Sequence, residues 1–497
     1  MIGSEALPFS KSGGLADVLG ALPGALARLN WPVTLVVPRY RGSTIDRPID
    51  RYAVTVGGHT TEVILHEAAI GHGARALLVE ASDLYDREGL YGLGSADYPD
   101  NPRRFAVLVR AALEHAARSG VRPSIVHAHD WQAGLAPVYL KTLYGSHPLL
   151  GGVPSVFTIH NLAYQGLFEP DWLPRLDLSW SQLSIDRLEY WGRISFLKGG
   201  INDANIITTV SRTYAEEIQT PDGGAGFDGI LRQRRADLVG ILNGIDVEQW
   251  DPSRDPHLPS AYDIDDLSGK KAAKRALLER YGLPLDKETL ARPIVAMISR
   301  MVDQKGFDLI AALAEELPHL DATFTVLGTG EPRYQDLWRG LATSYPSRVG
   351  ARIGFDEGLA HLIEAGSDLF LMPSRFEPCG LNQMYSLRYG TVPVVRAVGG
   401  LADTVCDPLA STGIKAAEAG KAGATGFVFH DYTPGALIEA LRRALATFRK
   451  PRAWKALQRA GMKQDHSWDR SAREYVRIYE RVSEPARTRS RQQRPPD

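Results

Sequence analysis

Short apolar segments alternate with longer amphipathic segments along the first 250 residues. Runs rich in Val and Ile predict strands, and apolar residues three or four positions apart predict helices between them. The predicted strands are 33–38, 62–66, 75–79, 125–128, 155–159, 206–210 and 239–242, and the predicted helices include 15–29, 103–119 and 213–218. This alternating order is typical of an α/β domain with a mainly parallel sheet.

The same alternation begins again after a connector rich in Pro and Asp at 250–266. A Lys-rich helix is predicted at 270–281, and strands are predicted at 294–298, 323–327, 351–353, 369–372, 392–395 and 427–429. The pattern therefore predicts a second α/β domain of similar build. We place the N-terminal domain at 1–250 and the C-terminal domain at 251–465.

The two ends of the chain depart from this alternation. A doubly wound domain normally begins with a complete apolar strand, but only residues 1–3 precede the first polar turn. We therefore expect either a truncated start or another segment in the place of the first strand. The spacing of the apolar residues in 466–483 predicts a helix with one apolar stripe. This stripe is formed by Trp468, Ala472, Tyr475, Tyr479 and Val482. The Arg- and Pro-rich segment 484–497 is predicted to be a disordered tail.

Composition narrows the class of protein. A chain of 497 residues is too long to fold around a single hydrophobic core, and its length fits two domains. Lys and Arg together number 57 against 58 Asp and Glu, so no overall charge favours a nucleic-acid or membrane partner. Two cysteines cannot form a disulfide scaffold, which favours a reducing compartment, and no apolar run is long enough to cross a membrane. No secretory signal is visible, so we expect a cytoplasmic protein.

Polar residues follow the predicted strands of the first domain, where α/β sheets bind ligands. Lys11 precedes a glycine turn that opens a helix, a pattern that suits an anion such as phosphate. His127, His129, Asp130 and Trp131 end the strand at 125–128 and suggest a polar sugar site with an aromatic platform. A metal fits them less well, because no third and fourth ligand lie nearby in the sequence.

The second domain supplies cations and one carboxylate. Arg300 ends a strand and Lys305 precedes a helix, so both can converge on a diphosphate leaving group. Glu377 follows the strand at 369–372 and can accept hydrogen bonds from sugar hydroxyls, while the helix after Gly380 presents free N–H groups. Together these features favour a nucleotide diphosphate sugar, with cations in the place of a metal.

The segments KSGGLADV, VHAHDWQAGL, TIHNLAYQG, SRMVDQKG and PSRFEPCGL resemble those of bacterial glycogen synthases and plastid starch synthases, glycosyltransferase family 5. The resemblance is collinear from Ser4 to about Val482. It implies two Rossmann-like domains of the GT-B type facing each other across a deep cleft, with the final helix returning to the N-terminal domain. It also implies transfer of glucose from ADP-glucose to the non-reducing 4-hydroxyl of an α-1,4-glucan (glycogen), with retention and with no cofactor or metal.

The resemblance also implies roles for residues of this chain. It assigns catalysis to His160, Arg300, Lys305 and Glu377. It assigns donor binding to Lys11, Gly13, Gly14, Asp17, Asp130, Asn243, Gly330, Phe355, Cys379, Gly380 and Leu381. Tyr91 is expected to contact the acceptor glucan.

Three other functions stay open on the sequence. A related GT-B enzyme could use UDP-glucose, and a phosphorylase of similar fold would need pyridoxal phosphate. A catalytically impaired homologue would bind glucan without transferring glucose. The oligomeric state is not indicated by the sequence.

Overall fold

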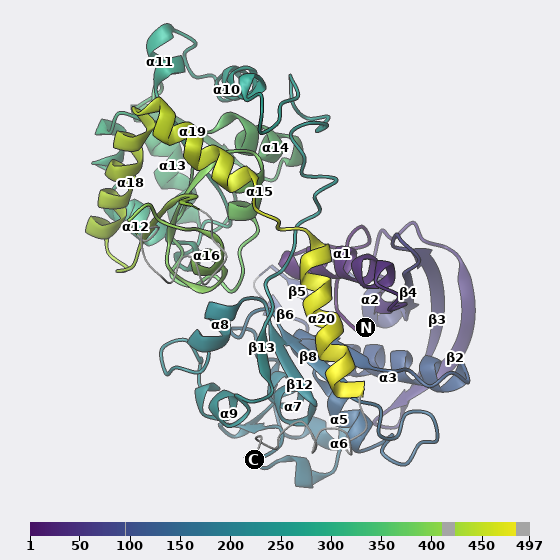
Figure 1. The fold of residues 1–497 in the computed structure, drawn as a ribbon. Helices are drawn as coiled ribbons and strands as arrows, with labels where there is room; N and C mark the ends of the chain where they lie inside the picture. The colour runs from purple at the N-terminus through teal and green to yellow at the C-terminus, as the bar shows by residue number, and fades with distance from the viewer. Residues whose placement is uncertain (95, 410–422, 484–497) are drawn as a thin grey trace, which may run out of the picture. The chain divides into compact units, whose positions relative to one another are not determined.

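The structure is a computed structural model that describes residues 1–94, 96–409 and 423–483 (Figure 1). The predicted disordered tail at 484–497 lies outside the described residues. The chain forms two compact units. Of the described residues, unit 1 comprises Met1–Gly244 and Trp468–Ser483, and unit 2 comprises the remainder, within Ile245–Ser467.

The sheet of unit 1 has a parallel part and an antiparallel extension. The parallel strands lie in the order β13 (Leu238–Gly240), β12 (Ile206–Thr209), β8 (Ser155–Ile159) and β7 (Val126–His129). The second group has the order β1 (Thr34–Pro38), β4 (Arg75–Glu80), β3 (His59–Ala69) and β2 (Pro48–Val56), in which only β1 and β4 are parallel. The sequence analysis did not predict β2, because its buried positions alternate with exposed ones and form no apolar run.

Residues 1–3 join these two groups of strands. Ile2 forms parallel bridges with Val36 of β1 and with Ala128 of β7. The Ile2 N–H donates to the His127 carbonyl over 2.9 Å, and the Val36 N–H donates to the Met1 carbonyl over 2.9 Å. The first three residues therefore fill the place of the first strand themselves. Of the two alternatives, the one in which another segment takes that place is wrong.

The helices of unit 1 include α1 (Gly14–Arg28), α3 (Asn101–Arg118), α7 (Phe196–Asp203) and α20 (Trp468–Ser483). The predicted apolar stripe of the last helix is confirmed, because all five of its residues are buried in a cluster with Val18, Leu22 and Leu26 of α1. Figure 1 shows α20 in yellow beside α1, and Arg28 forms an ion pair with Asp469 across this contact. The shorter helices are α2 (Ser82–Tyr85), α4 (Asp130–Ala133), α5 (Leu135–Lys141), α6 (Trp172–Arg175), η1 (Trp180–Gln182), α8 (Arg212–Glu217) and α9 (Asp228–Gln233), and the short strands are β5 (Gly92–Leu93), β6 (Ala96–Asp97), β9 (Leu167–Phe168), β10 (Glu189–Tyr190) and β11 (Arg193–Ser195).

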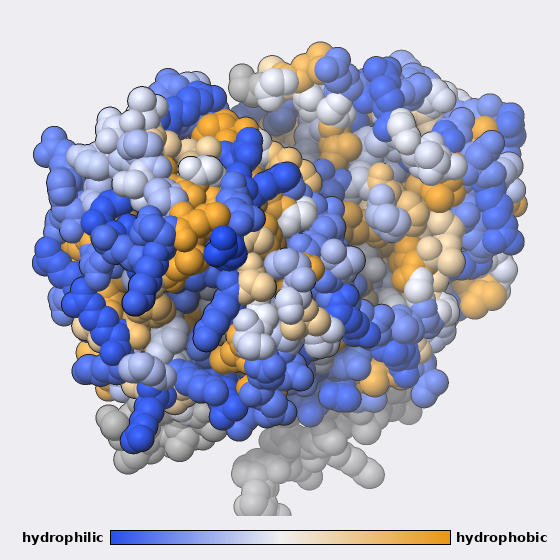
Figure 2. Space-filling view, turned by 90° about the horizontal axis from the view of Figure 1, so that it is seen from above, coloured by the Kyte–Doolittle hydropathy of each residue, from blue (hydrophilic) through white to orange (hydrophobic). Residues whose placement is uncertain are grey.

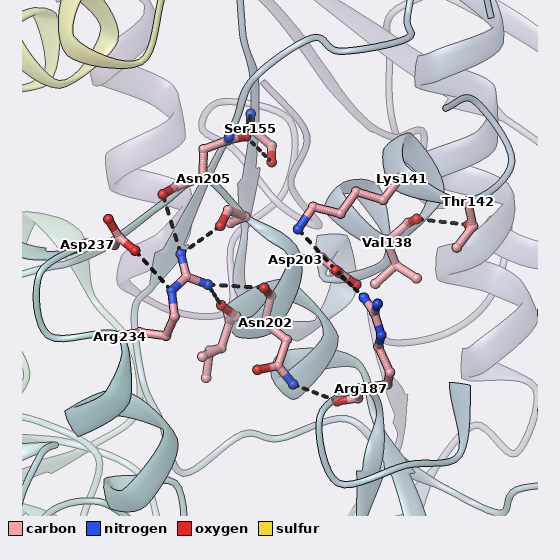
Figure 3. A network of polar contacts seen from close by, with 12 residues as sticks. Val138, Lys141, Thr142, Ser155, Arg187, Asn202, Asp203, Asn205, Arg234 and Asp237 are labelled. Carbon is pink, nitrogen blue, oxygen red and sulfur yellow. Dashed lines mark hydrogen bonds and ion pairs between the residues drawn. The ribbon is translucent and has the colours of Figure 1, made fainter. Parts of the chain in front are cut away.

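A polar network fixes the carboxyl end of α7 (Figure 3). Arg234 donates to the carbonyls of Ile201, Asn202 and Ala204, which are among the carbonyls that a helix end leaves without partners. Buried Asp203 forms ion pairs with Lys141 at 3.2 Å and Arg187 at 3.0 Å. This network holds α7 against the helices and loops beside it.

Unit 2 is built on a six-stranded parallel sheet. Its strands have the order β16 (Val349–Ile353), β15 (Thr323–Gly328), β14 (Ile294–Ile298), β17 (Leu369–Met372), β18 (Val392–Arg396) and β19 (Phe427–Phe429). Alternate residues of β14 contribute to two separate hydrophobic clusters, Val295 and Met297 to one, Ile294 and Ala296 to the other. Both faces of the sheet are therefore covered, as in a doubly wound domain.

The helices of unit 2 cover these two faces. They are α10 (Ser268–Tyr281), α11 (Lys287–Ala291), η2 (Asp303–Lys305), α12 (Phe307–Ala312), η3 (Leu317–His319), α13 (Pro332–Ser344), α14 (Glu357–Gly366), α15 (Asn382–Arg388), α16 (Gly399–Thr404), α18 (Pro434–Phe448) and α19 (Pro451–Met462). Among the described residues, no helix is long and apolar enough to cross a membrane. Figure 2 shows one face of the molecule, on which hydrophilic side chains predominate and apolar residues form separate patches.

Candidate active site

The site in unit 2 lies at the carboxyl ends of two neighbouring strands. Arg300 follows β14, Lys305 ends η2, and Glu377 follows β17, which pairs with β14. Lys305 Nζ lies 2.5 Å from Glu377 Oε2, and the Ser374 hydroxyl donates to the same oxygen over 3.0 Å. The structure therefore brings Lys305 and Glu377 into direct contact.

The contact leaves functional atoms of both residues available. Glu377 is 5% exposed, yet its Oε1 has no hydrogen bond to any described residue and is not among the buried unpaired atoms. The Lys305 ammonium has three protons and uses one on Glu377. Arg300 is exposed, and one of its guanidinium nitrogens donates to Gln304 Oε1 over 3.3 Å. The arrangement can thus bind an anion through its cations and a hydroxyl group through Glu377 Oε1.

Glycines allow the backbone to approach Glu377 closely. Gly399 has a φ of +43°, and a Cβ there would lie 2.0 Å from the Glu377 carbonyl oxygen. Gly380 also has a positive φ, and Gln383 Nε2 donates to the carbonyls of Cys379 and Gly380 over 3.1 and 3.0 Å. Leu381 follows them directly and is half-buried. These contacts fix the segment after Glu377.

Gly330 and Phe355, two further residues of unit 2 predicted to bind the sugar donor, differ in their surroundings. Gly330 forms a bridge with Met301, and a Cβ at Gly330 would lie 2.3 Å from the Met301 carbonyl oxygen. The structure therefore places Gly330 beside the segment that carries Arg300. Phe355 is 86% exposed, which leaves its ring free to stack on a planar group.

The loop that carries Lys11 in unit 1 is held by acidic side chains. The Ser12 N–H donates to Glu5 Oε2, and burial raises the pKa of Glu5. Lys11 Nζ lies 2.7 Å from Asp17 Oδ1 at the surface. Exposed pairs of this kind contribute about 1 kcal/mol or less, so an anion can replace Asp17 as the partner of Lys11. Gly13 and Gly14 are exposed next to them.

Asp130 holds the backbone of His160. It has a φ of +56°, and its Oδ1 accepts the His160 N–H over 2.7 Å. Burial raises the pKa of Asp130 to about 7 and lowers the pKa of His160 to about 3, so the imidazole of His160 is neutral at physiological pH. His160 Nε2 lies 3.0 Å from His129 Nδ1.

The predicted aromatic platform is wrong. Trp131 is 8% exposed and packs against Phe105, Phe168 and Phe196, with ring centroids 5.0, 5.7 and 6.5 Å away. His127 and His129 are also buried, because both side chains of β7 lie on a covered face of the sheet. Of the four residues of this motif, only Asp130 is half-buried, and both Asp130 and His129 contact His160.

The remaining predicted residues of unit 1 lie at separate places. The Tyr91 hydroxyl lies 2.8 Å from Ser4 Oγ, and burial raises the pKa of Tyr91 far above its usual value. Asn243 is buried, and its Oδ1 has no hydrogen-bond partner among the described residues. Outside positions 95, 410–422 and 484–497, no group of three His, Cys, Asp or Glu side chains forms a metal ligand set.

Sequence reasoning gave no role to Glu5 and Ser374, and it named His129 in the strand-end motif without its contact to His160. Glu5 holds Ser12, Ser374 binds Glu377, and His129 binds His160. Ser374 lies inside the motif PSRFEPCGL, three residues before Glu377, so its position could have indicated it. Glu5 is seven residues before Ser12, and only the folded turn brings the two together.

Two Rossmann-like units with a cationic site after the strands define a glycosyltransferase of the GT-B type. The family "Starch synthase catalytic domain" matches residues 1–233, and "Glycosyl transferases group 1" matches residues 286–459. The chain belongs to the glycogen synthase family. It is 50% identical to a glycogen synthase of Anaeromyxobacter dehalogenans over 96% of this chain and 98% of that protein, and 44% identical to one of Koribacter versatilis over 97% of each.

A solved structure agrees with this assignment. The catalytic domain of starch synthase IV from Arabidopsis thaliana, bound to ADP and acarbose, matches with a TM-score of 0.86 and 34% identity over 97% of this chain and 98% of that chain. A sucrose-phosphate synthase from Thermosynechococcus elongatus is 17% identical with a TM-score of 0.59 over 97% of this chain and 98% of that one, and shares the fold. The predicted family, fold class and glycogen synthase activity are confirmed.

Proposed function

We propose that the chain transfers glucose from ADP-glucose to the non-reducing 4-hydroxyl of an α-1,4-glucan, with retention. The observation that carries this proposal is the contact of Lys305 with Glu377, together with exposed Arg300, which donates to Gln304, the residue before Lys305. Family membership and the solved relative that binds ADP and acarbose support the same donor and acceptor classes.

The cations of unit 2 act on the leaving group. As the bond from glucosyl C1 to the diphosphate oxygen breaks, negative charge develops on the diphosphate of ADP. Arg300 and Lys305 stabilise that charge, and Lys11 of unit 1 adds a further cation for the phosphates once it releases Asp17. Fixed charges of this kind are most effective where charge develops in the transition state.

Glu377 binds the hydroxyl groups of the glucosyl residue through its available Oε1. Cys379, Gly380 and Leu381 line the same glucosyl site as Glu377. Gly330 lies beside the segment that carries Arg300. Phe355 stacks on the adenine. Gly13, Gly14, Asp17 and Asn243 complete the donor contacts.

No covalent nucleophile is assigned to the reaction. The acceptor hydroxyl bonds to C1 on the face that the diphosphate leaves, and its proton passes to the departing phosphate oxygen. His160 borders the glucosyl group, held by Asp130. Tyr91 contacts the acceptor glucan. We place this chemistry in the cytoplasm, since the chain has only two cysteines and they form no disulfide with each other, as is usual in reducing compartments.

The test is release of ADP from ADP-glucose with and without glycogen. Glucan-dependent ADP release that UDP-glucose does not match supports the proposal. Glycogen binding without ADP release would identify an impaired homologue, and equal rates with UDP-glucose would overturn the donor assignment. Glu377→Ala should abolish most turnover, and a variant with near-normal turnover would contradict the role of Glu377.

A further inference from the structure

We propose that His129 is a positioning residue that keeps the ring proton of His160 on Nδ1, so that His160 presents a hydrogen-bond donor to the substrate. The proposal rests on the function proposed above, in which His160 borders the glucosyl group. His129 ends β7 and His160 follows β8, the neighbouring parallel strand. This pairing brings His129 Nδ1 to 3.0 Å from His160 Nε2.

One proton must lie between these two nitrogens. A neutral imidazole carries one ring proton, on either nitrogen. Burial lowers the pKa of both His129 and His160, so both rings are neutral. Either His129 Nδ1–H donates to His160 Nε2, or His160 Nε2–H donates to His129 Nδ1.

The other nitrogen of His129 distinguishes the two arrangements. His129 Nε2 is buried and has no hydrogen-bond partner among the described residues. In the second arrangement it would carry a buried, unpaired N–H, whereas in the first it carries only an unpaired lone pair. Buried N–H groups without partners are rarer than acceptors without partners. The first arrangement is therefore favoured, with the proton of His129 on Nδ1.

The tautomer of His160 follows from that of His129. Because His160 Nε2 accepts a hydrogen bond, the proton of His160 lies on Nδ1. His160 Nδ1 has no hydrogen bond to any described residue and is not among the buried unpaired atoms. It is therefore available to donate to an oxygen of a ligand.

The ring of His129 is itself held in place. It stacks on His127 with ring centroids 4.1 Å apart and planes inclined by 30°. His127 is fixed at both nitrogens, by the Tyr479 hydroxyl at 2.7 Å and by Thr158 Oγ1 at 2.6 Å. A hydroxyl of α20 thus supports the ring that determines the tautomer of His160.

This arrangement gives His160 one chemical role. A neutral ring with Nδ1–H exposed can bind a sugar oxygen, and the bond strengthens if that oxygen gains negative charge. The same ring cannot remove a proton through Nδ1. The acceptor hydroxyl must therefore lose its proton to another group, in agreement with the departing phosphate as base.

The test uses the full-length protein with ¹⁵N-labelled histidine. Long-range ¹H–¹⁵N correlation spectra distinguish Nδ1–H from Nε2–H, and the signals of His160 are those missing from H160Q. We expect Nδ1–H in the native chain. H129L should release His160 toward Nε2–H and lower kcat about 10–100-fold, the range seen for outer partners of metal-ligating histidines. H129N places an amide nitrogen near the position of Nδ1 and should retain the tautomer and most of kcat.

His66→Leu is the matched control, since His66 is buried on β3 and contacts Glu80 rather than His160. It should leave the tautomer of His160 unchanged. A proton on Nε2 in the native chain would overturn the proposal, and so would an H129L variant with unchanged tautomer and kcat. The native spectrum decides even if H129L does not fold. A native Nδ1–H together with unchanged kcat in H160Q would overturn the role of His160 in transfer, not the effect of His129 on its tautomer.

Discussion

Lys305 Nζ lies 2.5 Å from Glu377 Oε2, although 72 positions separate the two residues in the sequence. The two lie together because β14 and β17 are neighbours, and parallel strands present their carboxyl ends at one edge of a sheet. The Ser374 hydroxyl donates a hydrogen bond to the same oxygen, Glu377 Oε2. The ion pair orients both groups and leaves Glu377 Oε1 available for a ligand.

Lys305→Ala should lower kcat about 10²–10³-fold, in line with the loss of one fixed donor at a developing charge. The physical reason is that the leaving diphosphate loses a cation. Initial rates of ADP release at saturating glycogen measure the effect. Lys287→Ala, at an exposed lysine of α11 in the same unit, is the control and should have native kcat. A Lys305→Ala variant within threefold of native kcat would contradict contact with the leaving group.

Phe355→Ala should raise KM for ADP-glucose about tenfold or more, because base stacking on an aromatic ring contributes about 1–3 kcal/mol. Thermal stability should not change, since the side chain is 86% exposed. Trp191→Ala removes another exposed ring, in unit 1, and should leave KM unchanged. Direct titration with ADP provides an independent measurement, and equal ADP affinity in the native and Phe355→Ala proteins would reject adenine stacking.

Tyr479→Phe should lower the free energy of unfolding by about 1–3 kcal/mol, because it leaves buried His127 Nδ1 without its partner. Tyr40→Phe is the matched comparison. The Tyr40 hydroxyl is buried and has no hydrogen-bond partner among the described residues, so its removal should be neutral or stabilising. Urea unfolding of both variants measures the difference. Equal stabilities would mean that the hydroxyl of Tyr479 contributes nothing through His127.

The raised pKa of Asp130 should make the free energy of unfolding decrease as pH rises. Its pKa is about 7 in the folded protein, against 3.8 as the ordinary value. Between about pH 4 and 7 the folded protein keeps a proton that the unfolded chain has lost. The free energy of unfolding therefore decreases over this window and levels off above it.

Asp130→Asn isolates this effect, because asparagine tolerates positive φ and keeps an acceptor oxygen but does not titrate. The stability of the native protein relative to Asp130→Asn should decline from pH 4 to 7. Chemical unfolding at several pH values measures it. A difference that stays constant or grows with pH would show that the pKa of Asp130 is not raised.

The sequence by itself determined the local elements and the places where strands end. Apolar runs predicted every strand of the unit 2 sheet, and the apolar stripe of α20 predicted a buried helix face. The polar residues directly after those strands gave Arg300 and Glu377 as candidates. These features depend on side chains within one turn or one strand, so a single segment contains the information.

Only the tertiary structure decided which of these residues contact one another. It placed residues 1–3 between β1 and β7, turned Trp131 into the core, and brought Glu5 to Ser12 and His129 to His160. Each outcome depends on the pairing of segments distant in sequence, where burial and backbone hydrogen bonding determine which side of a strand is covered. Local patterns do not contain that information, because a residue on a strand can face either the core or a ligand until its neighbours are in place.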